Sequence, residues 1–297
     1  MIKLKYKYVL EAFMTGAFDT SYAKNIMASL PERPEESNKG TFGRVLCVCG
    51  SLGMAGAAYL SALAAYRTGA GLVEIFTPEE NRIIIQTLLP EAVVTTYDTE
   101  NFDDRKLTSS IDKCDSLLIG CGLGTSHTSL EILKCALRYK DVPTVIDADA
   151  LNLLSEHKFL LKYAKGSILT PHLKEMSRLT DMTVEEIQKD IERVASEFSE
   201  KHELCCVLKD HSTVVSDIGA RTYLNTLGNS GMATGGSGDV LAGVIASLLA
   251  QKHLSLSRFD AATLGVYLHA VAGDRSAEAL GRSAVMARDI ANNIRFQ

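Results

Sequence analysis

The stretch G-N-S-G-M-A-T-G-G-S-G-D-V-L-A-G, from Gly228 to Gly243, carries the strongest local signal in the sequence. Five of its glycines lie within residues 228–238, directly before an apolar stretch that is typical of a helix. Glycines let backbone amides close on a ligand, and the start of the following helix directs free amides and the positive end of its dipole to the same place. The stretch therefore predicts an anion site where a loop meets a helix, and a phosphate group is the anion that fits best.

The sequence around this loop alternates between apolar, β-branched runs and amphipathic stretches. Several runs are apolar throughout, as in strands that are covered on both faces. This alternation predicts an α/β fold with a mostly parallel central sheet and helices on both faces, in three layers. The predicted strands are Val45–Cys49, Leu72–Thr77, Ala92–Tyr97, Ser116–Ile119, Thr144–Ile146, Ser167–Leu169 and Leu204–Leu208, followed by a hairpin of Val214–Ser216 and Thr222–Asn225. The predicted helices are Ala55–Thr68, Glu79–Leu88, Thr128–Tyr139, Thr183–His202 and Asp239–Gln251, and residues 258–297 are expected to be helical throughout.

Length and composition limit the class of protein. The chain has 297 residues, of which 46% are hydrophobic and 23% charged, so it can bury a large core and is not disordered as a whole. With 31 basic and 36 acidic residues its net charge is −5, which gives no bulk attraction for nucleic acid or anionic lipid. Aromatic residues make up only 6% and tryptophan is absent, which disfavours a platform for stacking bases. We therefore expect no nucleic-acid partner and no membrane partner.

Residues 1–38 differ from the remainder of the chain. They have weak helical periodicity, and the proline-containing segment from Pro31 to Glu36 ends any helix there. The sequence that follows has no internal repeat and no linker. We therefore expect residues 1–297 to form one domain, with residues 1–38 as an N-terminal arm and residues 39–297 as a catalytic core.

The cysteines and the apolar runs bear on the cellular compartment. The seven cysteines are odd in number and contain no C-x-x-C pair, so we expect neither a disulfide framework nor a zinc site. Glu11 interrupts the apolar stretch that a signal peptide needs, and the longest apolar run, Val240–Ala250, is shorter than the ~20 residues of a membrane span. A reducing cytoplasm fits this composition best.

Asp239 stands at the mouth of the glycine-rich loop. A carboxylate repels a bound phosphate, so its presence there needs a reason. One reason is general-base catalysis, in which Asp239 takes a proton from a hydroxyl group that attacks a phosphoryl group. The alternative is an ordinary helix N-cap, a position that aspartate favours. The long glycine-rich approach favours the catalytic interpretation.

Several other candidate residues follow predicted strands. The loops Gly50–Gly56 and Gly120–Thr125 lack the spacing of known nucleotide motifs, and close packing of helix on sheet would equally explain their glycines. In the segment Asp147–Asn152, the carboxylates could hold Mg²⁺ through water or cap the next helix. His172 is either a binding residue or a structural histidine, and Lys209 either meets a nucleotide phosphate or lies in a solvated turn. If the strands are parallel, all of these residues open on one crevice at the carboxyl edge of the sheet.

In combination these motifs resemble the ADP/ATP-dependent NAD(P)H-hydrate dehydratases, a family of ribokinase-like metabolite-repair enzymes. The resemblance runs from about Lys39 to the C-terminus, with the motifs in the order of the family. The matching motifs are K-G-T-F-G-R-V from Lys39, G-S-L-G-M-A-G-A from Gly50, G-A-G-L-V from Gly69, D-A-D-A-L-N from Asp147, L-T-P-H from Leu169 and the loop from Gly228.

The resemblance implies a ribokinase-like fold and a stand-alone dehydratase. With Mg²⁺ and ADP or ATP, such an enzyme would phosphorylate the C6 hydroxyl of the (6S) hydrate of NADH or NADPH (NADHX or NADPHX), with Asp239 as the base. Elimination of phosphate would restore NAD(P)H, and AMP would be released from ADP. The resemblance also implies a homotetramer and an NAD(P)HX epimerase as functional partner, and it assigns no side chain to a metal. By position, the hydrate would contact Ala57, Gly124, His172 and Asp239, and the nucleotide would contact Lys209, Asp210, His211, Ser212, Thr213, Gly235, Gly236, Ser237 and Gly238.

Two segments depart from the family pattern, and two other functions stay open. Cys121 stands where the family usually has proline, and Leu173 and Lys174 replace the Pro-Gly of H-P-G-E, so we expect altered loop stiffness rather than lost activity. A ribokinase-like hydroxymethylpyrimidine or hydroxyethylthiazole kinase would share the glycine-rich loop but would release a stable phosphate ester. A non-catalytic nucleotide-binding protein would have no need of Asp239.

Overall fold

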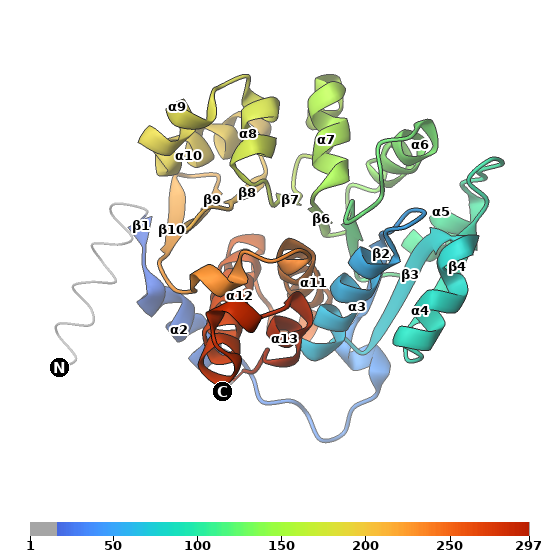
Figure 1. Cartoon of the computed structure of the whole chain (residues 1–297), viewed down its shortest axis with the longest axis horizontal. Helices are drawn as coiled ribbons and strands as arrows, with labels where there is room; N and C mark the ends of the chain where they lie inside the picture. The colour runs from blue at the N-terminus through green and yellow to red at the C-terminus, as the bar shows by residue number, and fades with distance from the viewer. Residues whose placement is uncertain (1–16, 297) are drawn as a thin grey trace.

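The computed structural model of the chain describes residues 17–296, which form one central sheet between two layers of helices (Figure 1). The described residues contribute ten strands in the order β1-β10-β9-β8-β7-β6-β5-β2-β3-β4. Neighbouring strands are parallel except at β10–β9 and β9–β8, so β9 runs against the others. The predicted α/β class with a mostly parallel sheet is confirmed. The strands are β1 (Ala17–Phe18), β2 (Arg44–Val48), β3 (Leu72–Pro78), β4 (Val93–Tyr97), β5 (Ser116–Ile119), β6 (Thr144–Ile146), β7 (Ile168–Leu169), β8 (Cys205–Leu208), β9 (Thr213–Asp217) and β10 (Arg221–Asn225).

The helices fall into two layers, one on each face of the sheet (Figure 1). The first layer contains α2 (Thr20–Ser29), α3 (Ala55–Arg67), α4 (Arg82–Leu88), α11 (Ser237–Ala250), α12 (Arg258–Leu280) and α13 (Ala287–Asn292). The second contains α5 (Arg105–Ile111), α6 (His127–Ala136), α7 (Asp149–Glu156), α8 (Leu173–Thr180), α9 (Val184–Lys189) and α10 (Ile191–His202). Short 3-10 turns are η1 (Lys39–Phe42), η2 (Glu79–Asn81), η3 (Lys158–Tyr163), η4 (Ser230–Met232), η5 (Lys252–Leu254) and η6 (Arg282–Ala284). Between residues 17 and 296, no helix is both long and apolar enough to cross a membrane.

Alternation along the strands divides the apolar side chains between two cores. In β2, Val45 and Cys47 pack in the core beneath α3, α11 and α12, whereas Leu46 and Val48 pack in the core beneath α6, α7 and α10. All four side chains are fully buried, and β8 divides its residues in the same way. Because both faces of the sheet are covered, a strand such as β2 must be apolar at every position, which explains why its sequence does not alternate.

The sequence predicted the strands closely and the helices less well. The predicted helix Thr183–His202 is two helices, because the chain leaves helical geometry at Asp190, whose φ is −158° and whose side chain accepts a hydrogen bond from the amide of Arg193 at 3.2 Å. The expectation that residues 258–297 are helical throughout is wrong, since α12 ends at Leu280 and the backbone is extended at Val285 and Met286. Helices α5, α7 and α8 were not predicted.

The described part of the N-terminal arm lies against the body of the protein. Strand β1 pairs with β10, and the hydroxyl of Tyr22 donates to Asp260 Oδ1 at 2.7 Å, which joins α2 to α12. Residues 1–16, which include Glu11, lie outside the described residues. The division into one domain with an arm of residues 1–38 stays a prediction.

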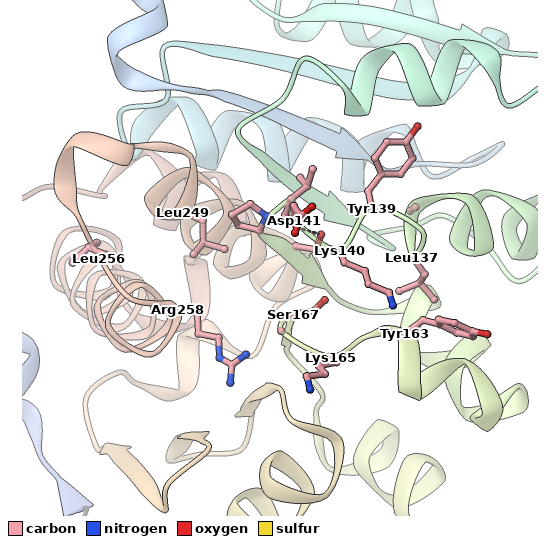
Figure 2. A pocket seen from close by; sticks show the side chains of 15 residues that line it. Leu137, Tyr139, Lys140, Asp141, Tyr163, Lys165, Ser167, Leu249, Leu256 and Arg258 are labelled. Atoms are coloured by element: carbon pink, nitrogen blue, oxygen red, sulfur yellow. Dashed lines mark hydrogen bonds between the residues drawn. The ribbon is translucent and has the colours of Figure 1, made fainter.

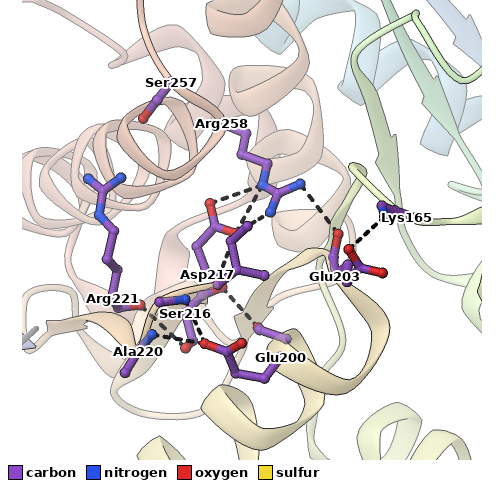
Figure 3. A network of polar contacts seen from close by, with 12 residues as sticks. Lys165, Glu200, Glu203, Ser216, Asp217, Ala220, Arg221, Ser257 and Arg258 are labelled. Carbon is purple, nitrogen blue, oxygen red and sulfur yellow. Dashed lines mark hydrogen bonds and ion pairs between the residues drawn. The ribbon is translucent and has the colours of Figure 1, made fainter.

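A network of charged side chains fixes the β9–β10 hairpin to the helical layers (Figure 3). Arg258, at the start of α12, donates from Nε to both carboxylate oxygens of Asp217 at 2.9 Å. Its Nη1 reaches the carbonyl oxygen of Glu203 at 3.4 Å, and Lys165 pairs with the Glu203 carboxylate at 2.6 Å. The Asp217 side chain is 8% exposed, so its charge depends on Arg258 for compensation.

We predict that Arg258→Ala destabilises the protein by about 3 kcal/mol, because it leaves the buried Asp217 carboxylate without its cation. The free energy of urea unfolding measures this effect. Arg193→Ala, which breaks an exposed ion pair with Glu197, is the matched control and should cost less than about 1 kcal/mol. Equal losses in the two variants would contradict the structural role of Arg258.

Candidate active site

The functional residues predicted from sequence meet where the parallel strands end. Strands β5, β6 and β8 end at Ile119, Ile146 and Leu208, and the loops that follow them lie at one edge of the sheet. Helix α11 begins at the same edge, because a Cβ atom on Gly238 would lie only 3.4 Å from Lys209 Nζ. The fold therefore brings the glycine-rich loop to the ends of the strands.

Two carboxylates, a thiol and an ammonium group form the centre of the site. A carboxylate oxygen of Asp147, one of Asp239 and the Sγ atom of Cys121 all lie within 4.8 Å of one another. Lys209 Nζ donates to Asp147 Oδ1 at 2.8 Å, and Cys121 Sγ is 3.7 Å from Asp147 Oδ2. Asp147 is 1% exposed and Cys121 is fully buried. Lys209 therefore does not lie in a solvated turn, because its ammonium group binds a carboxylate of the protein; its contact with a nucleotide phosphate stays a prediction.

Close backbone contacts direct Asp147 into the site. A Cβ atom on Gly120 would lie 2.0 Å from the carbonyl oxygen of Asp147, and Gly120 has a φ of 123°, so no other residue fits there. Ala148 has a φ of 50°, which residues other than glycine rarely adopt. The amide of Asp149 donates to the carbonyl of Gly120 at 3.2 Å. The loops after β5 and β6 are thus held together by their backbones, with the Asp147 side chain between them.

Asp239 is the third residue of α11 and not its N-cap. Gly236, with a φ of 90°, occupies the N-cap position, and no side chain caps this helix. Burial and the negative charge of Asp147 raise the pKa of Asp239 to about 6. A carboxylate with this pKa is mostly ionised at neutral pH and still accepts a proton more strongly than an exposed aspartate does. The N-cap interpretation is therefore wrong, and a proton-accepting role fits the geometry.

Gly235–Gly238 and Lys209 form the electropositive side of the site. The Cβ position of Gly235 has no atom within 4 Å, so the backbone of the loop is open there. The first amides of α11 have no partner within the helix and can bind an anion next to Lys209. The predicted nucleotide residues 210–213 follow Lys209 and lead into β9, where the ring of His211 is 87% exposed and its Nδ1 lies 3.3 Å from Asp210 Oδ2.

His172 caps the start of α8 and also faces the site edge. Its Nδ1 accepts hydrogen bonds from the amides of Lys174 at 3.0 Å and Glu175 at 3.2 Å, so the neutral ring carries its proton on Nε2. Burial, together with the charge of Lys209, lowers the pKa of His172 and favours this neutral form. A β-bridge joins His172 to Lys209. Its Nε2 lies 3.4 Å from Glu175 Oε1, so both ring nitrogens already face groups of the protein, and a binding role for His172 stays a prediction.

Ala57, in the first turn of α3, lies beside the loop that contains Gly124. A Cβ atom on Gly122 would come within 2.8 Å of the Cβ of Ala57, and the amide of Gly50 donates to the carbonyl of Cys121 at 2.8 Å. The amide of Gly124 donates to Asp149 Oδ2 at 2.8 Å. Asp149 therefore fixes the Gly120–Thr125 loop, and the alternative interpretation, in which Asp149 caps its own helix, is wrong.

The sequence did not assign Cys121 or Glu175 to the site. Glu175 is 5% exposed, accepts a hydrogen bond from the amide of His172 at 2.8 Å, and has a pKa that burial raises to about 7. A carboxylate three residues after His172 matches the spacing of a capping box, which could have indicated its position. A cysteine in a glycine-rich loop gives no such signal, because a thiol is equally common in an apolar core.

The described side chains do not form a resident magnesium site. The cluster that has metal-binding residue types contains Cys121, and Mg²⁺ takes oxygen ligands rather than sulfur. Lys209 already neutralises Asp147, and the Asp149 carboxylate is bonded to an amide. The predicted Mg²⁺ therefore finds no cage made only of side-chain oxygens among residues 17–296.

A pocket of about 280 Å³ lies at the opposite edge of the sheet, near the starts of β6 and β7 (Figure 2). Lys140, Lys165 and Arg258 line it together with Tyr139 and Tyr163. None of the site residues predicted from sequence lines this pocket. The chemistry predicted from sequence thus belongs to the carboxyl edge of the sheet.

A mostly parallel α/β sheet whose strand ends face a glycine-rich helix start and a half-buried aspartate defines a ribokinase-like enzyme. A family model described as NAD(P)H-hydrate dehydratase matches residues 45–295. The chain is 38% identical over 269 residues to the ADP-dependent (S)-NAD(P)H-hydrate dehydratase of Neisseria meningitidis, a match that covers 89% of this chain and 88% of that protein. The chain belongs to the NAD(P)H-hydrate dehydratase family.

Other relatives differ in length or in sequence. The chain is 38% identical over 288 residues to the bifunctional NAD(P)H-hydrate repair enzyme of Coxiella burnetii, where the match covers 96% of this chain and 57% of that enzyme. The chain thus spans about half the length of the bifunctional relatives. The ADP/ATP-dependent NAD(P)H-hydrate dehydratase of Bacillus subtilis, co-crystallised with ATP and Mg²⁺, superimposes with a TM-score of 0.77 at 29% identity over 93% of this chain and 97% of that one. A hydroxyethylthiazole kinase from Pyrococcus horikoshii has a TM-score of 0.62 at 15% identity over 93% of each chain, a likeness of fold alone.

We predict that Gly120→Ala lowers the free energy of unfolding by at least about 2 kcal/mol, since the added methyl group overlaps the Asp147 carbonyl and the φ of 123° is strained for alanine. Gly56→Ala is the control, because its Cβ position is open and lies within α3. That substitution should be neutral or stabilise the protein by up to about 1 kcal/mol. Urea unfolding of both variants measures the difference, and a neutral Gly120→Ala would show that the two loops are not in contact.

Proposed function

We propose that the protein restores NADH and NADPH from their (6S) hydrates, NADHX and NADPHX, with ADP or ATP as the phosphoryl donor. The observation that supports this most strongly is the half-buried Asp239 carboxylate at the first turn of α11, beside Lys209 and the open backbone at Gly235. This arrangement offers a base for a hydroxyl group and an electropositive cradle for a phosphoryl group at one place. The name of the N. meningitidis relative points to the same reaction.

In the proposed reaction, Asp239 takes the proton of the C6 hydroxyl while the hydroxyl oxygen attacks the terminal phosphorus of the nucleotide. The oxygen–phosphorus bond to the donor breaks, and AMP leaves from ADP, or ADP from ATP. The lone pair of the ring nitrogen then expels phosphate from C6, and loss of a proton from C5 restores the double bond of NAD(P)H. Amides of Gly235–Gly238 balance the charge on the transferring group.

The remaining contacts follow from the positions of the loops. We propose that Ala57, Gly124 and His172 bind the hydrate, and that residues 209–213 and 235–238 bind the nucleotide. Mg²⁺ would arrive with the nucleotide and shield its phosphate charges, since the described side chains form no cage for it. We further propose one catalytic domain, a homotetramer and a cytoplasmic location. An NAD(P)HX epimerase would supply the (6S) form, and a relative named as a bifunctional NAD(P)H-hydrate repair enzyme is compatible with such a second activity.

The direct test incubates the protein with NADHX, ADP and Mg²⁺ and follows the return of NADH absorbance. We expect NADH, AMP and phosphate in equal amounts, with ATP tested as the alternative donor. A stable phosphate ester in place of NADH would identify a ribokinase-like kinase. Nucleotide binding with no turnover of the hydrate by either donor would contradict the dehydratase function.

We predict that Asp239→Asn reduces kcat by about 100-fold or more, because an amide cannot take the proton. Its affinity for ADP, measured by calorimetry, should be unchanged or higher, since the substitution removes a negative charge near the phosphates. In the unsubstituted protein kcat/KM should fall as pH decreases through about 6, where Asp239 becomes protonated. Full turnover by Asp239→Asn, or a rate that is flat from pH 5 to 8, would contradict the role of Asp239 as base.

A further inference from the structure

Asp147 is a buried charged residue at the centre of the site for which the proposed reaction has no step. Its carboxylate is 1% exposed and holds Lys209 Nζ on one oxygen at 2.8 Å. One of its oxygens lies within 4.8 Å of an oxygen of Asp239. Two carboxylates at this distance repel each other when both are ionised, and a single ammonium group compensates only one of them.

The groups that face Asp239 come from four places in the fold. Asp147 and Asp149 come from the β6–α7 junction, Lys209 from the end of β8, Cys121 from the loop after β5, and Cys49 from the end of β2. Burial raises the pKa of Cys49, and contact with Cys49 together with burial raises that of Cys121, so both thiols are neutral. Glu175 also interacts electrostatically with Lys209. His269 of α12 is neutral because burial lowers its pKa to about 4. Among the described residues that face Asp239, Asp147 therefore provides the nearest negative charge and Lys209 the positive one.

The backbone holds Asp147 in this place independently of Asp239. Its amide donates to the carbonyl of Ile119 at 3.1 Å, and its carbonyl oxygen lies against Gly120. Lys209 is fixed from the other side, since its amide donates to the carbonyl of Pro171 at 2.8 Å. Strand β7 lies between β6 and β8, so the ion pair spans the end of β7. Neither partner needs Asp239 for its position, which makes the pair a fixed electrostatic environment for that residue.

We propose that Asp147, held by Lys209, is a positioning residue that sets the proton affinity of Asp239 for the transfer from the substrate hydroxyl. The repulsion between the two carboxylates makes Asp239 a stronger base than an isolated aspartate, and Lys209 limits that repulsion so that Asp239 is still ionised near neutral pH. Asp147 itself takes no proton from the substrate. This inference rests on the proposed function for its consequence in catalysis, whereas its electrostatic content can be measured without any substrate.

The experiment titrates Asp239 by NMR in protein that carries carbon-13 in the aspartate carboxyl groups. The signal of Asp239 is the one missing from Asp239→Asn. In Asp147→Asn we expect the midpoint of this signal to move to lower pH by about one unit, because the neighbouring charge is gone and Lys209 is left as an unpaired cation. Asp149→Asn is the matched control: it makes the same substitution two residues away, and its charge acts more weakly on Asp239, so the midpoint should move less. Lys209→Met should move the midpoint to higher pH, and this variant tests the inference even if Asp147→Asn does not fold.

The pH dependence of kcat/KM gives a second measurement. The acid limb of kcat/KM should shift in the same directions as the NMR midpoints, whereas a merely structural role of Asp147 would lower the plateau and leave the limb in place. An Asp239 midpoint in Asp147→Asn that equals the unsubstituted value, or that shifts no further than in Asp149→Asn, would overturn the proposal. If the midpoints shift as expected but neither the unsubstituted protein nor any variant turns over NADHX, the proposed function fails, whereas the electrostatic coupling between Asp147 and Asp239 stands.

Discussion

The ion pair between Lys209 and Asp147 is the interaction on which the site depends. It joins the ends of β6 and β8 across β7, and these strands reach a common edge because the sheet is parallel there. The pair allows a carboxylate that is 1% exposed to stay charged in the interior, and it places the ammonium group beneath the first turn of α11. The charges of Asp147 and Lys209 therefore act on Asp239 before any ligand binds.

The proposed anion site is local, so the protein as a whole need not be basic. The chain has a net charge of −5, yet the start of α11, the open backbone at Gly235 and the Lys209 side chain together present positive charge at one point. Backbone amides provide this charge without the desolvation cost of extra buried lysines. Close packing at Gly120 and Gly122 brings the loops after β2, β5 and β6 near enough for their backbones to surround a small volume.

The sequence predicted those parts of the fold that burial determines locally. Strands such as β5 and β6 are apolar runs with polar ends, and their predicted bounds match the structure. The break at Asp190 was missed because apolar periodicity continues through it, and only the capping geometry reveals it. The strand-end position of Asp147, His172 and Lys209 could be predicted, whereas the pairing of Asp147 with Lys209 and the presence of Cys121 between the carboxylates could not. Those contacts depend on which loops meet in space, and their residues are far apart in sequence.

In the proposed reaction the C6 hydroxyl group is phosphorylated before its oxygen leaves the ring, with Asp239 as the base. The most direct measurement uses NADHX that carries a heavy oxygen isotope in its C6 hydroxyl and determines where the label goes after turnover with ADP. The account predicts that the label appears in inorganic phosphate, because the C6–oxygen bond breaks after the oxygen has bonded to phosphorus. Label recovered in water, with unlabelled phosphate, would contradict it.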